Sequence, residues 1–354
     1  MKILLVLLLV VPAAIAAELL HASPVLVFCL SALAIIPLSG FLGRATEEIA
    51  AYTGPTLGGL LNATLGNMAE LIIAILALRA GLVDLVKASI TGSILGNLLL
   101  VLGLAQLAGG LRHKVQRFNI HLAGLSISLL VVAVIGLVIP ALFHATHVDP
   151  TREFTRKVSV GVAGLLIAGY CLSLVYSMGT HRNVFGEAGD VAECEHSSPE
   201  HPPWSLGRSV AVLAGSAAFV GWLSEILVGS TEAAIRDVGL SQVFVGLIIV
   251  PIIGNAAEHS SAVMMSLKNR MDIAVSIAIG SSAQVALLIA PVLVFVGLAL
   301  GQPMDLAFST FEVVSVALAV AVAASVMRDA ESNWLEGAFL LLVYGMLAVA
   351  FFYF

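Results

Sequence analysis

Long apolar runs alternate with short polar turns along the whole chain. A transmembrane helix needs about 20 mostly apolar residues to cross roughly 30 Å of hydrocarbon. No alternation typical of a membrane barrel is present, and single strands do not cross lipid, so each run is interpreted as a helix. The pattern predicts an all-α polytopic membrane protein with about eleven transmembrane helices, near 3–20, 25–43, 57–79, 83–110, 119–142, 157–179, 206–229, 240–267, 272–299, 305–327 and 334–353.

The composition agrees with a chain that lies mostly in lipid. Hydrophobic residues make up 60% of it and charged residues only 11%, whereas soluble domains carry about 25% charged residues. The basic residues are scattered singly, so the net charge of −6 gives no indication of a nucleic-acid partner. Cys29, Cys171 and Cys194 form no Cys-x-x-Cys pair, and a disulfide framework is not expected.

The first run has two interpretations. Lys2, an apolar stretch and Ala14-Ile15-Ala16 are also typical of a signal peptide with its cleavage site. We predict a retained transmembrane helix over 1–20, because the run is long for a signal core and one positive charge precedes it.

The positive charges predict a cytoplasmic N-terminus, because inner loops carry more Lys and Arg than outer ones. With that orientation the inner positions are Lys2, Arg44, Arg112, Lys114, Arg117, Arg182, Arg208, Lys268, Arg270 and Arg328. The outer positions are Arg79, Lys87, Arg152, Arg156, Lys157 and Arg236. We expect a prokaryotic cell membrane, or a vacuolar membrane if the source is eukaryotic.

An internal repeat appears when the chain is shifted by 188 residues. The matched pairs are Gly58/Gly246, Gly66/Gly254, Asn67/Asn255, Ala69/Ala257, Glu70/Glu258, Ala74/Ala262, Asp84/Asp272, Gly92/Gly280 and Ser93/Ser281. The two glutamates are five predicted helices apart, so the copies are expected to cross the membrane in opposite directions. The predicted domains are an N-terminal helix (1–20), a first five-helix repeat (25–180), an acidic cytoplasmic linker (181–205) and a second five-helix repeat (206–354).

The centre of each repeat carries a carboxylate inside an apolar run. The twin segments are Gly66-Asn67-Met68-Ala69-Glu70 and Gly254-Asn255-Ala256-Ala257-Glu258. A charged group there is costly unless it is paired, hydrated or protonated, which favours a function over simple packing. Each glycine favours local unwinding, and each asparagine lies three residues before its glutamate, on the same helix face. A structural ion pair is the alternative for the glutamates, and interhelical hydrogen bonding is the alternative for the asparagines.

The ligands that these segments offer are hard oxygens, which suit Ca²⁺. Two glutamates neutralise one divalent cation, and without it they are two buried like charges whose pKa values rise. Protons and Ca²⁺ then compete for Glu70 and Glu258, as an antiporter requires. Polar residues of the neighbouring runs are either neutral ligands of the same site or ordinary helix contacts; they are Ser93, Asn97, Ser281 and Gln284. The amides of Asn97 and Gln284 add no charge, which favours protons over Na⁺ as the exchanged ion.

These segments, together with Val250-Pro251-Ile252-Ile253 and Gly280-Ser281-Ser282-Ala283-Gln284, resemble the signature repeats of the calcium/proton exchanger (CAX) family of calcium–cation antiporters. The resemblance implies Ca²⁺/H⁺ exchange, with Glu70 and Glu258 binding Ca²⁺ and carrying protons. The stretches 45–48 and 223–232 also resemble family segments, which implies that their acidic residues line an access path. Those residues are Glu47, Glu48, Glu225 and Glu232.

Other polar residues have simpler explanations beside the functional ones. His259 is either a proton relay or a packed histidine, and the four access-path glutamates are either guides for cations or solvated interface carboxylates. Asp84 and Asp272 suit helix N-termini. We interpret the linker as a solvated acidic loop rather than a Ca²⁺ sensor. The group His144, His147 and Asp149 is interpreted as a chance cluster.

The sequence thus predicts a secondary transporter that exchanges Ca²⁺ for H⁺ by alternating access, with no resident cofactor and the transported Ca²⁺ bound at the midplane. A Na⁺/Ca²⁺ exchanger of the same superfamily is the alternative, and a cation channel is a remote one. An enzyme is not expected, because no nucleophile–base pair or closed metal triad is visible. A homo-oligomer is left open.

Overall fold

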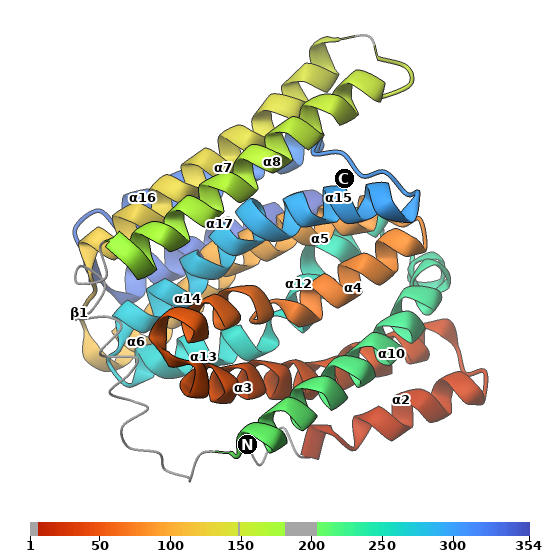
Figure 1. Cartoon of the computed structure of the whole chain (residues 1–354), viewed down its shortest axis with the longest axis horizontal. Helices are drawn as coiled ribbons and strands as arrows, with labels where there is room; N and C mark the ends of the chain where they lie inside the picture. The colour runs from red at the N-terminus through yellow and green to blue at the C-terminus, as the bar shows by residue number, and fades with distance from the viewer. Residues whose placement is uncertain (1–5, 148, 181–203) are drawn as a thin grey trace. The chain divides into compact units, whose positions relative to one another are not determined.

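The computed structural model describes residues 6–147, 149–180 and 204–354, and helices make up nearly all of this part (Figure 1). The predicted linker falls mostly on 181–203, outside the described residues. The chain divides into two compact units. The first unit comprises 1–89, 199–257 and Phe354, and the second comprises 90–198 and 258–353. Each unit is described by itself.

The first unit is built around one very long helix. Its elements are α2 (Val10–Leu19), α3 (Pro24–Leu65), α4 (Met68–Arg79), the start of α5 (Val83–Leu95), α10 (Leu206–Val238), α11 (Gln242–Phe244), η3 (Val245–Ile249) and α12 (Val250–Gly254). Helix α10 packs along α3 and also contacts α4, while α2 lies against α3. Where η3 crosses α5, Gly246 has no room for a side chain: an added Cβ would lie 2.7 Å from the carbonyl oxygen of Leu85.

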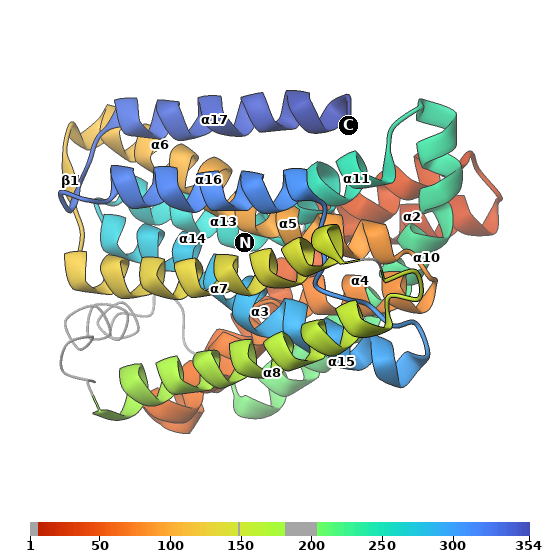
Figure 2. The ribbon, with the colours of Figure 1, turned by 90° about the horizontal axis from the view of Figure 1, so that it is seen from above.

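The second unit is a bundle with a two-residue ribbon at one end. Its remaining elements are η1 (Gly96–Val101), α6 (Leu102–His113), β1 (Gln116–Arg117), α7 (Ile120–Thr146), α8 (Glu153–Val175), η2 (Tyr176–Thr180), α13 (Ala256–Leu267), α14 (Met271–Gln284), η4 (Val285–Ile289), α15 (Ala290–Leu300), α16 (Thr310–Val326), β2 (Glu331–Ser332) and α17 (Trp334–Phe352). Helix α17 runs beside α6, as Figures 1 and 2 show. Helix α7 contacts α8, α14 and α16. Strands β1 and β2 pair antiparallel, with Gln116 opposite Ser332.

Glycines allow α6 and α17 to approach closely. A Cβ added to Gly337 would lie 2.6 Å from the carbonyl oxygen of Gly103, and one added to Gly110 would lie 2.8 Å from the carbonyl carbon of Asn333. The same Asn333 begins α17 with a capping box that includes Glu336. Small residues at helix contacts are the usual means of association in lipid, where apolar burial drives little packing.

The helices are long and apolar enough to cross a membrane, which confirms the predicted helical membrane class. Among the described residues, seven helices meet the requirement, or eight if the bent pair Gln242–Gly254 and Ala256–Leu267 is one span. Two shorter apolar helices accompany them, Val10–Leu19 and Thr310–Val326. Large apolar side chains are exposed on the outside, including Leu172 (69%) and Met346 (66%), as lipid contact requires. The layout of eleven helices in two repeats stays a prediction.

The helix boundaries differ from the expected ones at two places. We predicted separate runs over 25–43 and 57–79, but α3 continues from Pro24 to Leu65 and the break follows it, at Gly66 and Asn67. The polar stretch after residue 43 does not end the helix, because Ala and Glu are good helix formers. The predicted run over 240–267 is likewise interrupted, with a bend of 61° between Gly254 and Ala256. The π-helical segments η1 to η4 of the described residues were not predicted.

Candidate functional site

The two helix breaks have the same local form. Asn67 (φ −93°, ψ 25°) and Asn255 (φ −95°, ψ 10°) both leave helical geometry. A helix of 12 residues follows each of them, α4 from Met68 to Arg79 and α13 from Ala256 to Leu267. Their starts and their ends both differ by 188 residues (256 minus 68 and 267 minus 79). The local unwinding expected from the twin Gly-Asn pairs is therefore present in both.

Glu70 lies in the first turn of α4, where the positive end of the helix dipole favours a carboxylate. The side chain of Asn255 donates a hydrogen bond to Glu70, with Nδ2 and Oε1 2.5 Å apart. Asn255 and Asn67 are both buried, with 2% and 4% of their surface exposed. The amide from the other break, 185 residues away in sequence, thus holds the carboxylate in place.

Gly254 makes room for that carboxylate. A Cβ added at this position would lie 2.9 Å from Cγ of Glu70, too close for two carbon atoms. Helix α12 ends at Gly254, and its neighbour Asn255 supplies the hydrogen bond. The Gly-Asn pair of one segment therefore shapes the surroundings of the glutamate of the other.

We expect Gly254→Ala to raise the KM for Ca²⁺ about tenfold, because a displaced buried hydrogen bond to a charged group costs about 1.5 kcal/mol or more. Ca²⁺ uptake into proteoliposomes over a range of Ca²⁺ concentrations measures this. Gly215→Ala is the matched control in the same unit, since an added Cβ there meets nothing within 4 Å. Equal KM values for the two variants would contradict the role given to Gly254.

Glu258 and His259 lie in the first turn of α13 and are partly exposed. Nε2 of His259 is buried and has no hydrogen-bond partner among the described residues. A histidine that is only packed between helices is normally satisfied, so this observation favours the relay interpretation over the packed one.

The predicted neutral ligands lie beside π-helical segments. Ser93 (5% exposed) is on α5, Asn97 (1%) is in η1, and Ser281 (7%) is on α14. Gln284 is the last residue before η4. Both amide atoms of Asn97 lack a hydrogen-bond partner within the part of the chain that the structure describes. Ordinary interhelical hydrogen bonding therefore does not account for Asn97, and π-helical turns are frequent at functional sites.

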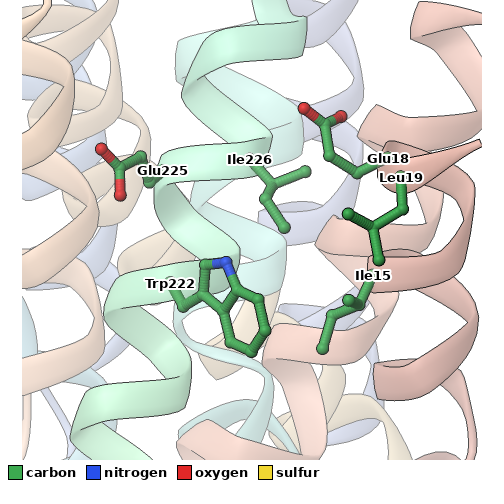
Figure 3. Close-up of a pocket in the computed structure, with 6 residues that line it drawn as sticks. All are labelled: Ile15, Glu18, Leu19, Trp222, Glu225 and Ile226. Atoms are coloured by element: carbon green, nitrogen blue, oxygen red, sulfur yellow. The ribbon is translucent and has the colours of Figure 1, made fainter. Parts of the chain in front are cut away.

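The acidic residues of α3 and α10 fall into different surroundings. Glu47 and Glu232 are exposed, as an access path or a solvated interface both require. Glu225 lines a pocket of about 220 Å³ between α10 and α2 (Figure 3). Glu18 of α2 lines the same pocket. Glu18 was not among the residues predicted to line an access path.

Glu48 has a structural role that the sequence did not reveal. Its Oε2 accepts a hydrogen bond from the backbone N–H of Trp204 at 3.0 Å, and its Oε1 lies 3.7 Å from Arg44. The guanidinium groups of Arg44 and Arg208 lie 4.8 and 4.7 Å from the centre of the Trp204 ring, and Tyr52 donates to the Trp204 carbonyl at 2.6 Å. These contacts fasten the start of α10 to α3 and account for Glu48 without transport.

The remaining polar residues have structural explanations. Asp84 and Asp272 lie in the first turns of α5 and α14, as predicted. Asp149 accepts hydrogen bonds from the backbone N–H and the hydroxyl of Thr155, at 2.8 and 3.0 Å, and the backbone bond is the main reason why the pKa of Asp149 is lowered. Among the described residues, no three His, Cys, Asp or Glu side chains form a metal cluster.

Apolar spans, a bent and broken span, and a carboxylate held at a helix break are together typical of a polytopic membrane transporter. Comparison with known proteins agrees. The family model for the sodium/calcium exchanger protein matches residues 23–179 and 208–353. The Ca²⁺/H⁺ antiporter of Synechocystis sp. is 47% identical, over 99% of this chain and 97% of the relative. The Ca²⁺/H⁺ antiporter ChaA of Bacillus subtilis is 41% identical, over 97% and 96%.

The solved structure of native YfkE superposes with a TM-score of 0.84, at 37% identity, covering 99% of this chain and 100% of YfkE. The chain therefore belongs to the sodium/calcium exchanger protein family and, within it, to the calcium/proton exchanger (CAX) family. The predicted resemblance is confirmed. Both of the sequence relatives are named as Ca²⁺/H⁺ antiporters.

Proposed function

We propose that this protein exchanges Ca²⁺ for H⁺ across a membrane, moving Ca²⁺ out of the cytosol as protons enter. The observation that carries the proposal is the Glu70 carboxylate, held by Asn255 at a helix break inside an apolar span. Relatives that cover almost the whole chain are named as Ca²⁺/H⁺ antiporters, which supports the choice of ions.

Glu70 and Glu258 are the shared Ca²⁺ and proton sites in this proposal. Because the repeat places both glutamates third in a helix that follows a Gly-Asn pair, we assign them equal roles. Two carboxylates neutralise one Ca²⁺, and the amide and hydroxyl oxygens of Asn67, Asn255, Asn97, Ser93, Ser281 and Gln284 supply further hard ligands. Without Ca²⁺, protons neutralise the same carboxylates, so the two ions compete.

The transport cycle follows from the repeat. Two five-helix repeats of opposite orientation give a site that opens first to one side of the membrane and then to the other. Glu225, Glu232 and Glu47 guide cations toward it, and His259 relays protons. In a prokaryotic cell membrane with the N-terminus inside, this cycle expels Ca²⁺.

A pair of imposed gradients tests the exchanged ion. Proteoliposomes that contain the purified full-length protein are expected to take up Ca²⁺ under a pH gradient in Na⁺-free buffer, and an added Na⁺ gradient should leave the rate unchanged. Uptake that requires a Na⁺ gradient would instead establish Na⁺/Ca²⁺ exchange. The uncharged amides of Asn97 and Gln284 favour the proton, since carboxylates in their place would suit additional monovalent cations. Ca²⁺ flux without any counter-ion would indicate a channel.

A further inference from the structure

The end of α13 is capped by side chains from other elements of the second unit. The last carbonyl groups of a helix have no partner inside it and must find one elsewhere. The carbonyl of Ser266 accepts a hydrogen bond from Nε2 of Gln116 at 2.8 Å, and the carbonyl of Leu267 accepts one from Nε2 of His113 at 2.9 Å. Gln116 belongs to β1 and His113 ends α6. Two of these carbonyl groups are thus bound by residues about 150 positions earlier.

The cap is buried and closely fitted. Gln116 has 2% of its surface exposed and Ser266 has none. The Gln116 amide also donates to Oδ1 of Asn269 at 3.0 Å and accepts from the Ser266 hydroxyl at 3.1 Å, and that hydroxyl lies 2.5 Å from the carbonyl oxygen of Ala105. A Cβ on Gly109 would collide with both Gln116 and Ser266. Every polar atom of the Gln116 side chain therefore has a partner around the end of α13.

The cap acts on the helix that carries Glu258. Helix α13 begins after the break at Asn255, where the span bends by 61°. The far end of α13 lies about three turns from its start, at 3.6 residues per turn. Hydrogen bonds from α6 and β1 hold the helix at that far end. Buried hydrogen bonds at that end hold the whole short helix, because a helix is stiff over this length.

We propose that Gln116, with Ser266 and His113, positions Glu258 for Ca²⁺ binding although none of the three touches the ion. The proposal rests on the function proposed for Glu258. Gln116 is a positioning residue in the two-residue strand β1. Loss of its hydrogen bonds shifts α13 and lowers the affinity of the Glu258 site for Ca²⁺.

The test compares Gln116→Leu with Arg117→Gln in Ca²⁺ uptake by proteoliposomes. Leucine is close to glutamine in size but makes no hydrogen bonds, so we expect the KM for Ca²⁺ to rise about tenfold with little change in Vmax, as expected for the loss of buried hydrogen bonds. Arg117 is the neighbour on the same strand, and its exposed side chain pairs with Glu331 at 3.1 Å, so its variant should keep the wild-type KM. Ser266→Ala, which removes only one hydroxyl group, is expected to raise the KM in the same direction.

The KM separates positioning from a role in folding alone. Partial misfolding lowers Vmax in proportion to the folded protein and leaves the KM unchanged, and that result for both Gln116→Leu and Ser266→Ala would overturn the proposal. Glu258→Gln is measured alongside. If it abolishes exchange while both cap variants keep the wild-type KM, only the role of the cap fails. If Glu258→Gln exchanges normally, the proposed function of Glu258 fails and the cap proposal fails with it.

Discussion

Ca²⁺/H⁺ exchange is expected to fall about a hundredfold or more in Glu70→Gln, which corresponds to roughly 2.8 kcal/mol at 1.4 kcal/mol for each factor of ten. Glutamine keeps the size of the side chain, and its carbonyl oxygen still accepts the hydrogen bond that Asn255 donates to Oε1. The substitution removes the negative charge that we propose binds Ca²⁺ and the carboxylate that we propose carries the proton. Loss of exchange then reports on charge rather than on packing.

The measurement is Ca²⁺ uptake under a pH gradient, with the amount of folded protein determined by size-exclusion chromatography in detergent. Glu258→Gln is expected to behave in the same way, because the repeat gives both glutamates one role. Glu153→Gln is the control: this exposed carboxylate of α8 pairs with Lys157 at 2.7 Å, and such surface pairs contribute little. Near wild-type exchange in both Glu70→Gln and Glu258→Gln would refute the proposed site.

The sequence identified the helix breaks because their chemistry is local. Glycine and asparagine both have low helix propensity, so unwinding at Asn67 and Asn255 could be expected from neighbouring residues. The pair alone does not decide, because Gly96-Asn97 stays helical in η1. The sequence match at 188 residues needs only the chain compared with itself, and the layout in two five-helix repeats stays a prediction. The sequence also placed Asp84 and Asp272 at helix starts, for the same local reason.

The partners across the fold could not be predicted in this way. Spacing along one helix associates Asn67 with Glu70, whereas Glu70 takes a hydrogen bond from Asn255, 185 residues away. Glu48 looked like a residue of an access path, but it binds the backbone of Trp204, 156 residues later. Hydrophobic periodicity reports which face of a helix is buried and not which distant segment covers it.

Short irregular elements were missed for a related reason. Gln116 lies in a polar turn between two apolar runs, and nothing in its neighbours indicates that it is buried. The continuous helix α3 was divided in the prediction because polarity was taken as a boundary at residues 44–56. In this chain the boundary is set by Gly66 and Asn67, where the backbone itself departs from helical geometry.

Gly337→Ala is expected to destabilise the protein by about 3 kcal/mol, because the new methyl group would meet backbone atoms that have no rotamer to change. Its Cβ would lie 2.6 Å from the carbonyl oxygen of Gly103 and 2.9 Å from the carbonyl carbon of Gln106, so α17 must move away from α6. Side-chain neighbours give way to a methyl group more easily than two helix backbones do.

Gly345→Ala is the control on the same helix, since a Cβ there meets nothing within 4 Å. Thermal unfolding in detergent, followed by loss of the monodisperse peak, should show a clear fall in the apparent Tm for Gly337→Ala and little change for Gly345→Ala. Equal Tm values would mean that α6 and α17 do not pack through these glycines. Helix association in lipid depends on van der Waals contact and on the close approach of the two backbones. A methyl group at the contact between α6 and α17 therefore destabilises the protein, whereas a methyl group that faces lipid does not.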